Sequence, residues 1–172
     1  MTTAHDKTDQ TTLEQLERRL SLVEAKQDII TVLYRMAQTV DYGEHPAWLD
    51  CFTDDIEFQM VEVSSTDRVV RVRHEGHQAL RDFIPGHTHA PEHFHKHLVG
   101  DPIVEVEGDL ATASSYLTRI DHGETGPYFW SFGRYLDTFR RCDDGKWRVT
   151  TRVIEVESRA APVKKSDIGA KK

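Results

Sequence analysis

The sequence is poor in cysteine and lacks any long apolar segment. Its 172 residues include 2 cysteines, Cys51 and Cys142, with no Cys-x-x-Cys or paired Cys/His spacing. This pattern excludes a structural zinc finger, and we expect both side chains to be reduced thiols. No apolar run approaches the roughly 20 residues that cross a bilayer, so no membrane-spanning segment is predicted.

The sequence also has fewer basic residues than acidic ones. Asp and Glu number 29 against 22 Lys and Arg, which gives a formal net charge of −7. This balance argues against nucleic acid or an anionic membrane as a partner. It argues more weakly for a small-molecule substrate or a protein partner. The first 20 residues are polar and acidic, so we expect no secretory signal and a cytoplasmic protein.

The N-terminal quarter has the periodicity of helix. Residues 1–11 are polar and are predicted to be disordered. Thr12 is a candidate N-cap, and apolar residues then recur every three or four positions as far as Val40. The length of this run favours a break near Ser21, and Gly43 is expected to end it.

After residue 53 the pattern changes to alternation, which predicts strands. A strand pair is expected over 56–73, a short helix over 76–84, and four antiparallel strands over 95–106, 110–121, 128–141 and 146–157. The tail 159–172 is predicted to be flexible. Residues 12–158 therefore form a single α+β domain, in which the long helix covers one face of a curved sheet and leaves a pocket.

Four segments carry a resemblance to a known family: residues 13–58, 76–84 (GHQALRDFI), 95–117 (HKHLVGDPIVEVEGDLATASSYL) and 133–149 (GRYLDTFRRCDDGKWRV). They resemble SnoaL-like proteins of the nuclear transport factor 2-like superfamily. The resemblance implies a cone-shaped, cystatin-like α+β barrel, with a curved, mostly antiparallel mixed sheet wrapped on the N-terminal helix. Such cones host dehydratases, isomerases, cyclases, dehydrochlorinases and non-catalytic subunits, so the fold does not fix the reaction.

The resemblance also implies a catalytic pair. Scytalone dehydratase, bile acid 7α-dehydratase and hexachlorocyclohexane dehydrochlorinase share an acid and a histidine, which match Asp41 in TVDYGEH and His97 in HKHLVGD. Val40 and Phe58 lack the hydroxyls found in scytalone dehydratase, which argues against that enzyme. A histidine oriented by a carboxylate is a workable base. In the alternative interpretation, Asp41 only ends its helix and His97 only lines the wall.

Further pocket residues follow from strand alternation and from the resemblance. If His97 faces inward, alternation along its strand turns His95 inward too. On the next strand, the resemblance implies that Leu117, Arg119 and Asp121 face inward. Arg119 is a candidate for stabilising a developing anion, and Asp121 for contacting substrate. The alternative is that Arg119 and Asp121 form only a salt bridge at the rim.

Tyr135, on the predicted strand over 128–141, is a candidate hydrogen-bond or proton donor. Tyr34, Phe58, Arg73 and Trp130 complete the predicted substrate-binding set, although the pattern around Arg73 favours a solvated edge strand. Trp130 belongs to an aromatic run over 128–132. By the resemblance, this run is also a candidate interface of a homodimer or homotrimer.

The loop over 87–97 contains five of the ten histidines. We predict no metal and no cofactor, with the loop lying over the mouth of the pocket. The alternative is a metal site made of two histidines and Glu92, as in a metal-dependent oxygenase.

Together these patterns predict a cofactor-independent lyase, or else an isomerase, acting on a bulky cyclic or aromatic small molecule. The lyase reaction would be a dehydration, another elimination, or a related C–C cleavage. The alternative is a non-catalytic small subunit or ligand-binding module that resembles the small subunits of ring-hydroxylating dioxygenases.

Overall fold

The computed structural model describes residues 4–160, with side chains from residue 12 onward. The chain begins with α1 (Ala4–Asp41), α2 (His45–Leu49), β1 (Phe52–Val63) and β2 (Arg68–Glu75). It continues with α3 (His77–Phe83) and the 3-10 turn η1 (Ile84–Gly86). Four strands follow: β3 (His95–Glu107), β4 (Leu110–Gly123), β5 (Gly126–Arg141) and β6 (Trp147–Arg159). The predicted α+β class is confirmed, and the predicted meander strands lie within a few residues of their observed ends.

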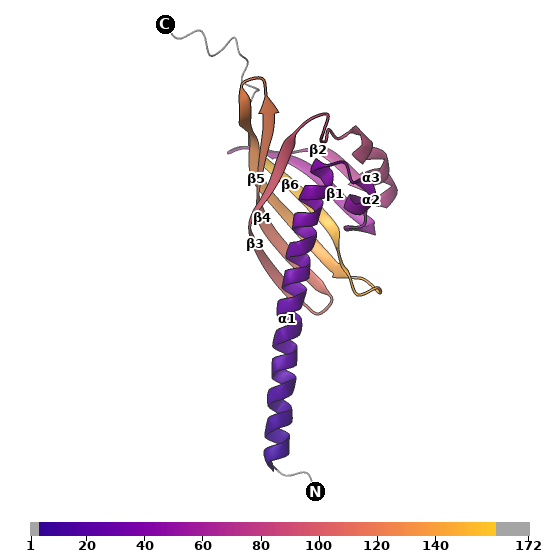
Figure 1. The fold of residues 1–172 in the computed structure, drawn as a ribbon, viewed down its shortest axis with the longest axis vertical. Helices are drawn as coiled ribbons and strands as arrows, with labels where there is room; N and C mark the ends of the chain where they lie inside the picture. The colour runs from indigo at the N-terminus through magenta and orange to yellow at the C-terminus, as the bar shows by residue number, and fades with distance from the viewer. Residues whose placement is uncertain (1–3, 161–172) are drawn as a thin grey trace.

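The six strands form one curved sheet in the order β2-β1-β6-β5-β4-β3. The contact between β1 and β6 is parallel, and the other neighbouring pairs are antiparallel. The C-terminal half of α1 lies across this sheet (Figure 1). Ile29, Leu33 and Met36 of α1 are buried there against residues such as Phe139 and Val149. The helix and the curved sheet therefore share one core, which confirms the predicted architecture.

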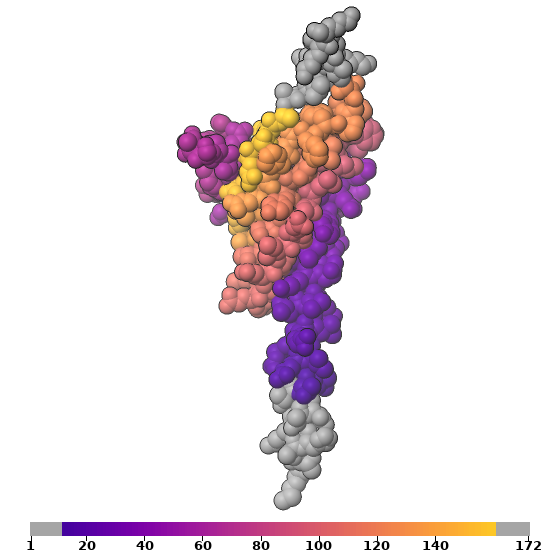
Figure 2. All heavy atoms as spheres, turned by 90° about the vertical axis from the view of Figure 1, so that its left-hand side faces the viewer, coloured from indigo at the N-terminus to yellow at the C-terminus, as the bar shows by residue number. Residues whose placement is uncertain are grey.

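The N-terminal half of α1 differs from the prediction. The helix begins at Ala4 rather than Thr12 and continues through Ser21 without a break. It extends beyond the end of the sheet (Figures 1 and 2). The leucines and the valine there are between 43% and 63% exposed: Leu13, Leu16, Leu20, Leu22 and Val23. Periodic apolar positions predicted the helix correctly, but only its second half covers the sheet.

Residues 1–3 and 161–172, which belong to the two predicted disordered ends, lie outside the described residues. None of the described helices combines the length and the apolar character that crossing a bilayer requires.

The end of α1 is held by a tight turn and by the loop that leads to β3. Gly43 has a φ of +69°, a conformation that residues with a Cβ rarely adopt, and the His89 ring packs directly against it. The backbone N–H of Ala90 donates to the carbonyl of Asp41 at 2.9 Å. The turn and this loop together place Asp41, the last residue of α1, beside the start of β3.

We expect Gly43→Ala to destabilise the fold. The left-handed conformation alone costs a residue with a Cβ about 1–2 kcal/mol, and the new methyl group would also collide with the His89 ring. Urea unfolding measures the loss. Gly86→Ala is the matched control, because a Cβ there meets open space. Equal stability of the two variants would contradict this account of the turn.

Candidate active site

A cavity of about 100 Å³ lies between α1 and the concave face of the sheet. For comparison, an engineered cavity of about 150 Å³ binds benzene. The walls are mainly apolar, with a few polar side chains. The residues that line it are Leu33, Met36, Ala37, Val40, Trp48, Phe58, Met60, Phe83, Ile84, His87, His97, Val99, Leu117, Arg119, Trp130, Ser131, Tyr135, Arg152, Ile154 and Val156.

Asp41 and His97 meet at the wall of this cavity. The ring Nδ1 of His97 lies 2.6 Å from Oδ1 of Asp41, and the backbone N–H of His97 donates to Oδ2 at 3.0 Å. Asp41 is only 2% exposed. An ionised carboxylate accepts hydrogen bonds only, so Nδ1 of His97 carries the hydrogen. In the neutral form of this ring Nε2 has the lone pair, and the ring lines the cavity.

Opposite His97 on β4, Arg119 provides a fixed positive charge. Arg119 is the cross-strand partner of His97. Its Nε and Nη2 donate to the Asp121 carboxylate at 2.6 and 3.0 Å, and its guanidinium lies over the Trp130 ring. Burial opposes ionisation of Asp121, but the hydrogen bonds from Arg119 hold the pKa of Asp121 below its ordinary value. The structure thus contains the predicted Arg119–Asp121 pair, and Arg119 also lines the cavity.

Two more histidines stand beside the pair. His95 on β3 is buried, and its Nε2 lies 3.4 Å from Oδ1 of Asp41. His87 follows η1 and lines the cavity. Desolvation lowers the pKa of each to about 4. Both rings are therefore neutral at neutral pH, and together with His97 they are the residues here that could hold a metal ion.

A second ion pair lies deeper in the core. Nε of Arg152 is 3.2 Å from Oδ1 of Asp137, and both side chains are almost fully buried. The Arg152 guanidinium also lies over the Tyr135 ring and donates to the sulfur of Met36. Burial raises the pKa of Asp137 to about 6 and that of Tyr135 to about 12. Tyr135 can therefore donate a hydrogen bond but does not ionise readily.

The structure brings most of the predicted site residues together. Phe58, Leu117 and Trp130 line the cavity with His97, Arg119 and Tyr135. Asp41, His95 and Asp121 are buried directly behind this lining, where Asp41 contacts His97 and Asp121 contacts Arg119.

The structure places two of the predicted substrate-binding residues, Tyr34 and Arg73, away from the cavity. Tyr34 is 43% exposed and lies on the outer side of α1, in a groove with Arg35 and Gln38. Although Tyr34 follows the buried Leu33 in the chain, the helical repeat turns its side chain about 100° from that of Leu33, toward solvent. Arg73 is exposed on the edge strand β2, where it pairs with Glu75 at 2.7 Å. Both side chains therefore lie outside the cavity.

Two polar residues that line the cavity, His87 and Arg152, were not among the site residues predicted from the sequence. His87 was one of five histidines in the loop, and nothing in the sequence marked it as the one turned inward. Arg152 alternates along β6 with Ile154 and Val156, all of which line the cavity. A charged residue at an inward position of a strand was the signal available for Arg152, and extending the alternation to β6 would have found it.

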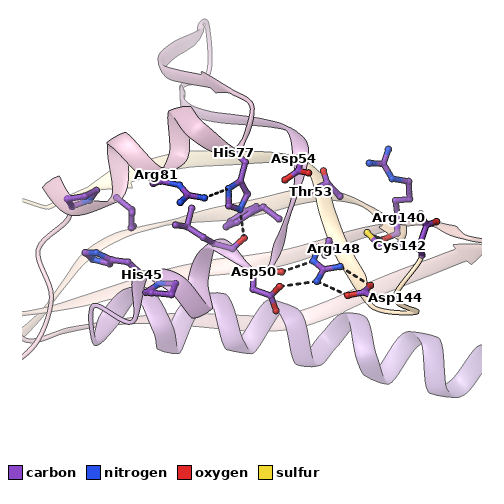
Figure 3. A pocket seen from close by; sticks show the side chains of 16 residues that line it. His45, Asp50, Thr53, Asp54, His77, Arg81, Arg140, Cys142, Asp144 and Arg148 are labelled. Carbon is purple, nitrogen blue, oxygen red and sulfur yellow. Dashed lines mark hydrogen bonds and ion pairs between the residues drawn. The ribbon is translucent and has the colours of Figure 1, made fainter.

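A larger hollow, of about 860 Å³, lies outside the cone, beside α2 and α3 (Figure 3). Several of its charged groups bind one another. Arg148 donates to Asp50 and Asp144 at 2.9 Å, and His77 contacts the carbonyl of Leu49. The cone cavity instead presents a buried histidine–carboxylate pair to an enclosed space, so we take the cone cavity as the candidate active site.

A curved sheet closed by a long helix around one pocket defines the cystatin-like fold of nuclear transport factor 2-like proteins. Residues 21–153 match the SnoaL-like domain family, and the chain belongs to that family. Comparison with curated proteins gave no match.

Solved structures share the fold. A nuclear transport factor 2-like protein with a cystatin-like fold from Novosphingobium aromaticivorans is 26% identical, with a TM-score of 0.74 over 87% of this chain and 92% of that one. The β subunit of a putative aromatic-ring-hydroxylating dioxygenase from the same species is 21% identical, with a TM-score of 0.69 over 84% and 99%. ActVI-ORFA from Streptomyces coelicolor is 17% identical, with a TM-score of 0.62 over 76% and 96%.

We expect Arg152→Met to destabilise the protein by about 3–5 kcal/mol, because it leaves the Asp137 carboxylate buried without its partner. The loss should grow as the pH rises through about 6, where Asp137 gives up its proton. The double variant Arg152→Met/Asp137→Leu removes both charges and should regain most of the stability. Urea unfolding at several pH values measures all three proteins. A double variant no more stable than the single one would contradict this.

Proposed function

We propose that the chain is a cofactor-independent lyase or isomerase that moves a proton with His97. The observation that carries the proposal is the 2.6 Å contact between His97 and the buried Asp41 at the wall of an enclosed cavity. The carboxylate orients the ring and stabilises the imidazolium that forms when Nε2 takes a proton. This arrangement supports catalysis without any added group.

In an elimination, Nε2 of His97 removes a proton from a carbon next to an electron-withdrawing group. The electron pair left on that carbon forms the new double bond, and the leaving group departs with the electrons of its own bond. The imidazolium then gives its proton to the leaving group. In an isomerisation the same proton returns to another carbon of the substrate. A related C–C cleavage would again need a proton acceptor at this position.

Arg119 supports the proposal because negative charge develops on the substrate during such a step. Its guanidinium is held by Asp121 and by the Trp130 ring, so it needs little rearrangement when charge appears. The buried hydroxyl of Tyr135 offers a further hydrogen bond at the cavity wall. These two groups are the proposed stabilisers of an enolate, a phenolate or a leaving anion.

The cavity volume narrows the substrate class. About 100 Å³ suits a compound with one ring rather than the bulky substrate expected from the sequence. Phe58, Leu117 and Trp130 supply apolar surface for such a ring. A larger substrate would have to displace side chains of the wall.

The second candidate is a non-catalytic subunit or ligand-binding module. Two solved structures with the same fold favour it, because they are β subunits of dioxygenases, 21% and 19% identical to this chain. A subunit without chemistry would not need a carboxylate buried against a histidine at a cavity wall, so we rank this role second.

We expect His97→Ala and Asp41→Asn each to lower kcat by about 100-fold or more, as general acid–base catalysis requires. The assay follows, by mass spectrometry, single-ring compounds that carry a leaving group β to a carbonyl. His122→Ala, which removes an exposed histidine of β4, is the control and should keep full activity. Circular dichroism confirms that each variant is folded. Unchanged kcat in both variants, or no turnover by the wild type, would reject the assignment.

We also propose that the chain forms homo-oligomers through the outer face of β3–β5. Leu98 and Phe132 both pair with Thr118 across neighbouring strands, and they are 48% and 53% exposed. Tyr116 and Phe129 are exposed on the same strands. Apolar side chains clustered on a surface in this way are typical of a protein interface.

We expect Leu98→Ser/Phe132→Ser to shift the protein toward the monomer, because it removes apolar surface from this face. Light scattering coupled to gel filtration measures the mass. Leu16→Ser is the matched control, because it removes an exposed leucine of α1 away from the sheet. A mass that responds only to Leu16→Ser would place the interface on α1 instead.

A further inference from the structure

We propose that His87, His95 and His97 bind one divalent transition-metal ion at the wall of the cone cavity. This proposal goes beyond the proposed function and does not depend on it. It replaces the pairing of two histidines with Glu92 that the sequence suggested, since Glu92 is exposed and is not part of this cluster.

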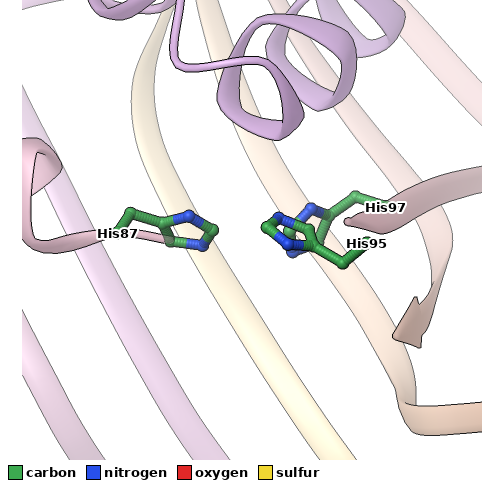
Figure 4. A group of neighbouring side chains, drawn as sticks. All are labelled: His87, His95 and His97. Carbon is green, nitrogen blue, oxygen red and sulfur yellow. The ribbon is translucent and has the colours of Figure 1, made fainter. Parts of the chain in front are cut away.

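The three rings converge on one point. Each histidine offers a ring nitrogen, and these three nitrogens all lie within 4.8 Å of one another. Figure 4 shows the ring of His87, on the loop after η1, directed toward the rings of His95 and His97 on β3. The ring centroids are 5.3 Å apart for His87–His95, 5.7 Å for His87–His97 and 5.1 Å for His95–His97.

The spacing is close to what a metal ion requires. Zinc binds imidazole nitrogen at about 2.0–2.1 Å, so two ligands in a tetrahedral site lie about 3.3 Å apart. The ring nitrogens are at most 4.8 Å apart, so any two of them must approach by no more than about 1.5 Å to reach this spacing. Small rotations of the three side chains can share that movement.

Two of the rings already have the hydrogen-bonding pattern of metal ligands. A ligand histidine usually donates its other ring N–H to a carboxylate or a backbone carbonyl. Nδ1 of His97 is hydrogen-bonded to Asp41 at 2.6 Å, and Nδ1 of His87 to the carbonyl of Thr88 at 2.7 Å. With both N–H groups committed in this way, Nε2 of each ring keeps the lone pair that would bind the ion.

His95 supplies a separate observation. Its side chain is fully buried, yet neither ring nitrogen has a hydrogen-bond partner among the described residues. A buried polar group without a partner is rare in folded proteins. A metal ion between His87, His95 and His97 would satisfy one nitrogen, and the neighbouring Asp41 carboxylate would accept from the other.

The surrounding charges are compatible with a cation. The buried Asp41 carboxylate lies against both His95 and His97 and offsets part of the ion's charge. The neighbouring cation Arg119 is engaged by both oxygens of Asp121. Because His87 and His97 line the cavity, the open coordination position would face the cavity. Three imidazole ligands suit Zn²⁺, Co²⁺, Ni²⁺, Cu²⁺ or Fe²⁺ and do not suit Mg²⁺ or Ca²⁺.

Metal binding and the proposed proton transfer use the same atom. An ion bound to Nε2 of His97 prevents that nitrogen from accepting a proton. We therefore expect the loaded protein to have lower lyase or isomerase activity than the metal-free protein. The binding measurement below needs no turnover, so the two proposals can fail separately.

The test titrates the metal-free, full-length protein with Zn²⁺ by calorimetry and with Co²⁺ by visible absorption. We expect one ion per chain and the intense absorption of tetrahedral Co²⁺. His95→Ala and His87→Gln should each weaken Zn²⁺ binding by about 100-fold or more, and Asp41→Asn by about 10- to 100-fold as the residue that orients a ligand. His122→Ala removes an exposed histidine and should leave binding unchanged.

Because His95 is in the core, His95→Ala is interpreted only if circular dichroism shows that it is folded. His87→Gln, on a loop, gives an independent answer. Absence of Zn²⁺ binding by the wild type would overturn the proposal. Binding that neither His87→Gln nor a folded His95→Ala weakens would also overturn it, because the ion would then be held elsewhere on the surface.

Discussion

The carboxylate of Asp41 joins the end of α1 to the first strand of the meander. It receives the backbone N–H and the ring nitrogen of His97 and also lies close to His95. A charge buried to this extent is stable only when it is paired and hydrogen-bonded. The position of α1 over the sheet and the orientation of the His97 ring are therefore set by the same contact. The packing of the cone and the proposed chemistry at its wall therefore involve the same side chain.

The other charged side chains at the cavity are each paired with a neighbouring side chain of opposite charge. Arg119 is paired with Asp121 near the start of β3, and Arg152 is paired with Asp137 deeper in the core. Between them the walls are largely apolar. Electrostatic interactions are strong in such surroundings because little water screens them. A small set of fixed dipoles and charges can thus act on a substrate without large rearrangement.

Much of the fold could be predicted from local sequence. Strict alternation between turns such as Gly108-Asp109 predicted the meander strands, because side chains of a strand alternate between two faces. The burial of α1 could not be predicted. Leu22 and Leu33 are about three helical turns apart and lie on nearly the same side of α1, yet Leu22 is exposed and Leu33 is fully buried. What separates them is where the sheet ends, which is a property of the assembled fold.

The sequence by itself determined the α+β class, the helix that ends near Asp41, and a strand face shared by His95 and His97. These depend on periodicity and turn chemistry, which act over a few residues, whereas the inward positions of Leu117 and Arg119 came from the resemblance to SnoaL-like proteins. Only the tertiary structure decided that Tyr34 faces away from the cavity, that His87 comes within reach of His97, and that Arg152 pairs with Asp137. Such contacts join segments far apart in the chain, and their geometry exists only after α1, the loop and β6 have packed together.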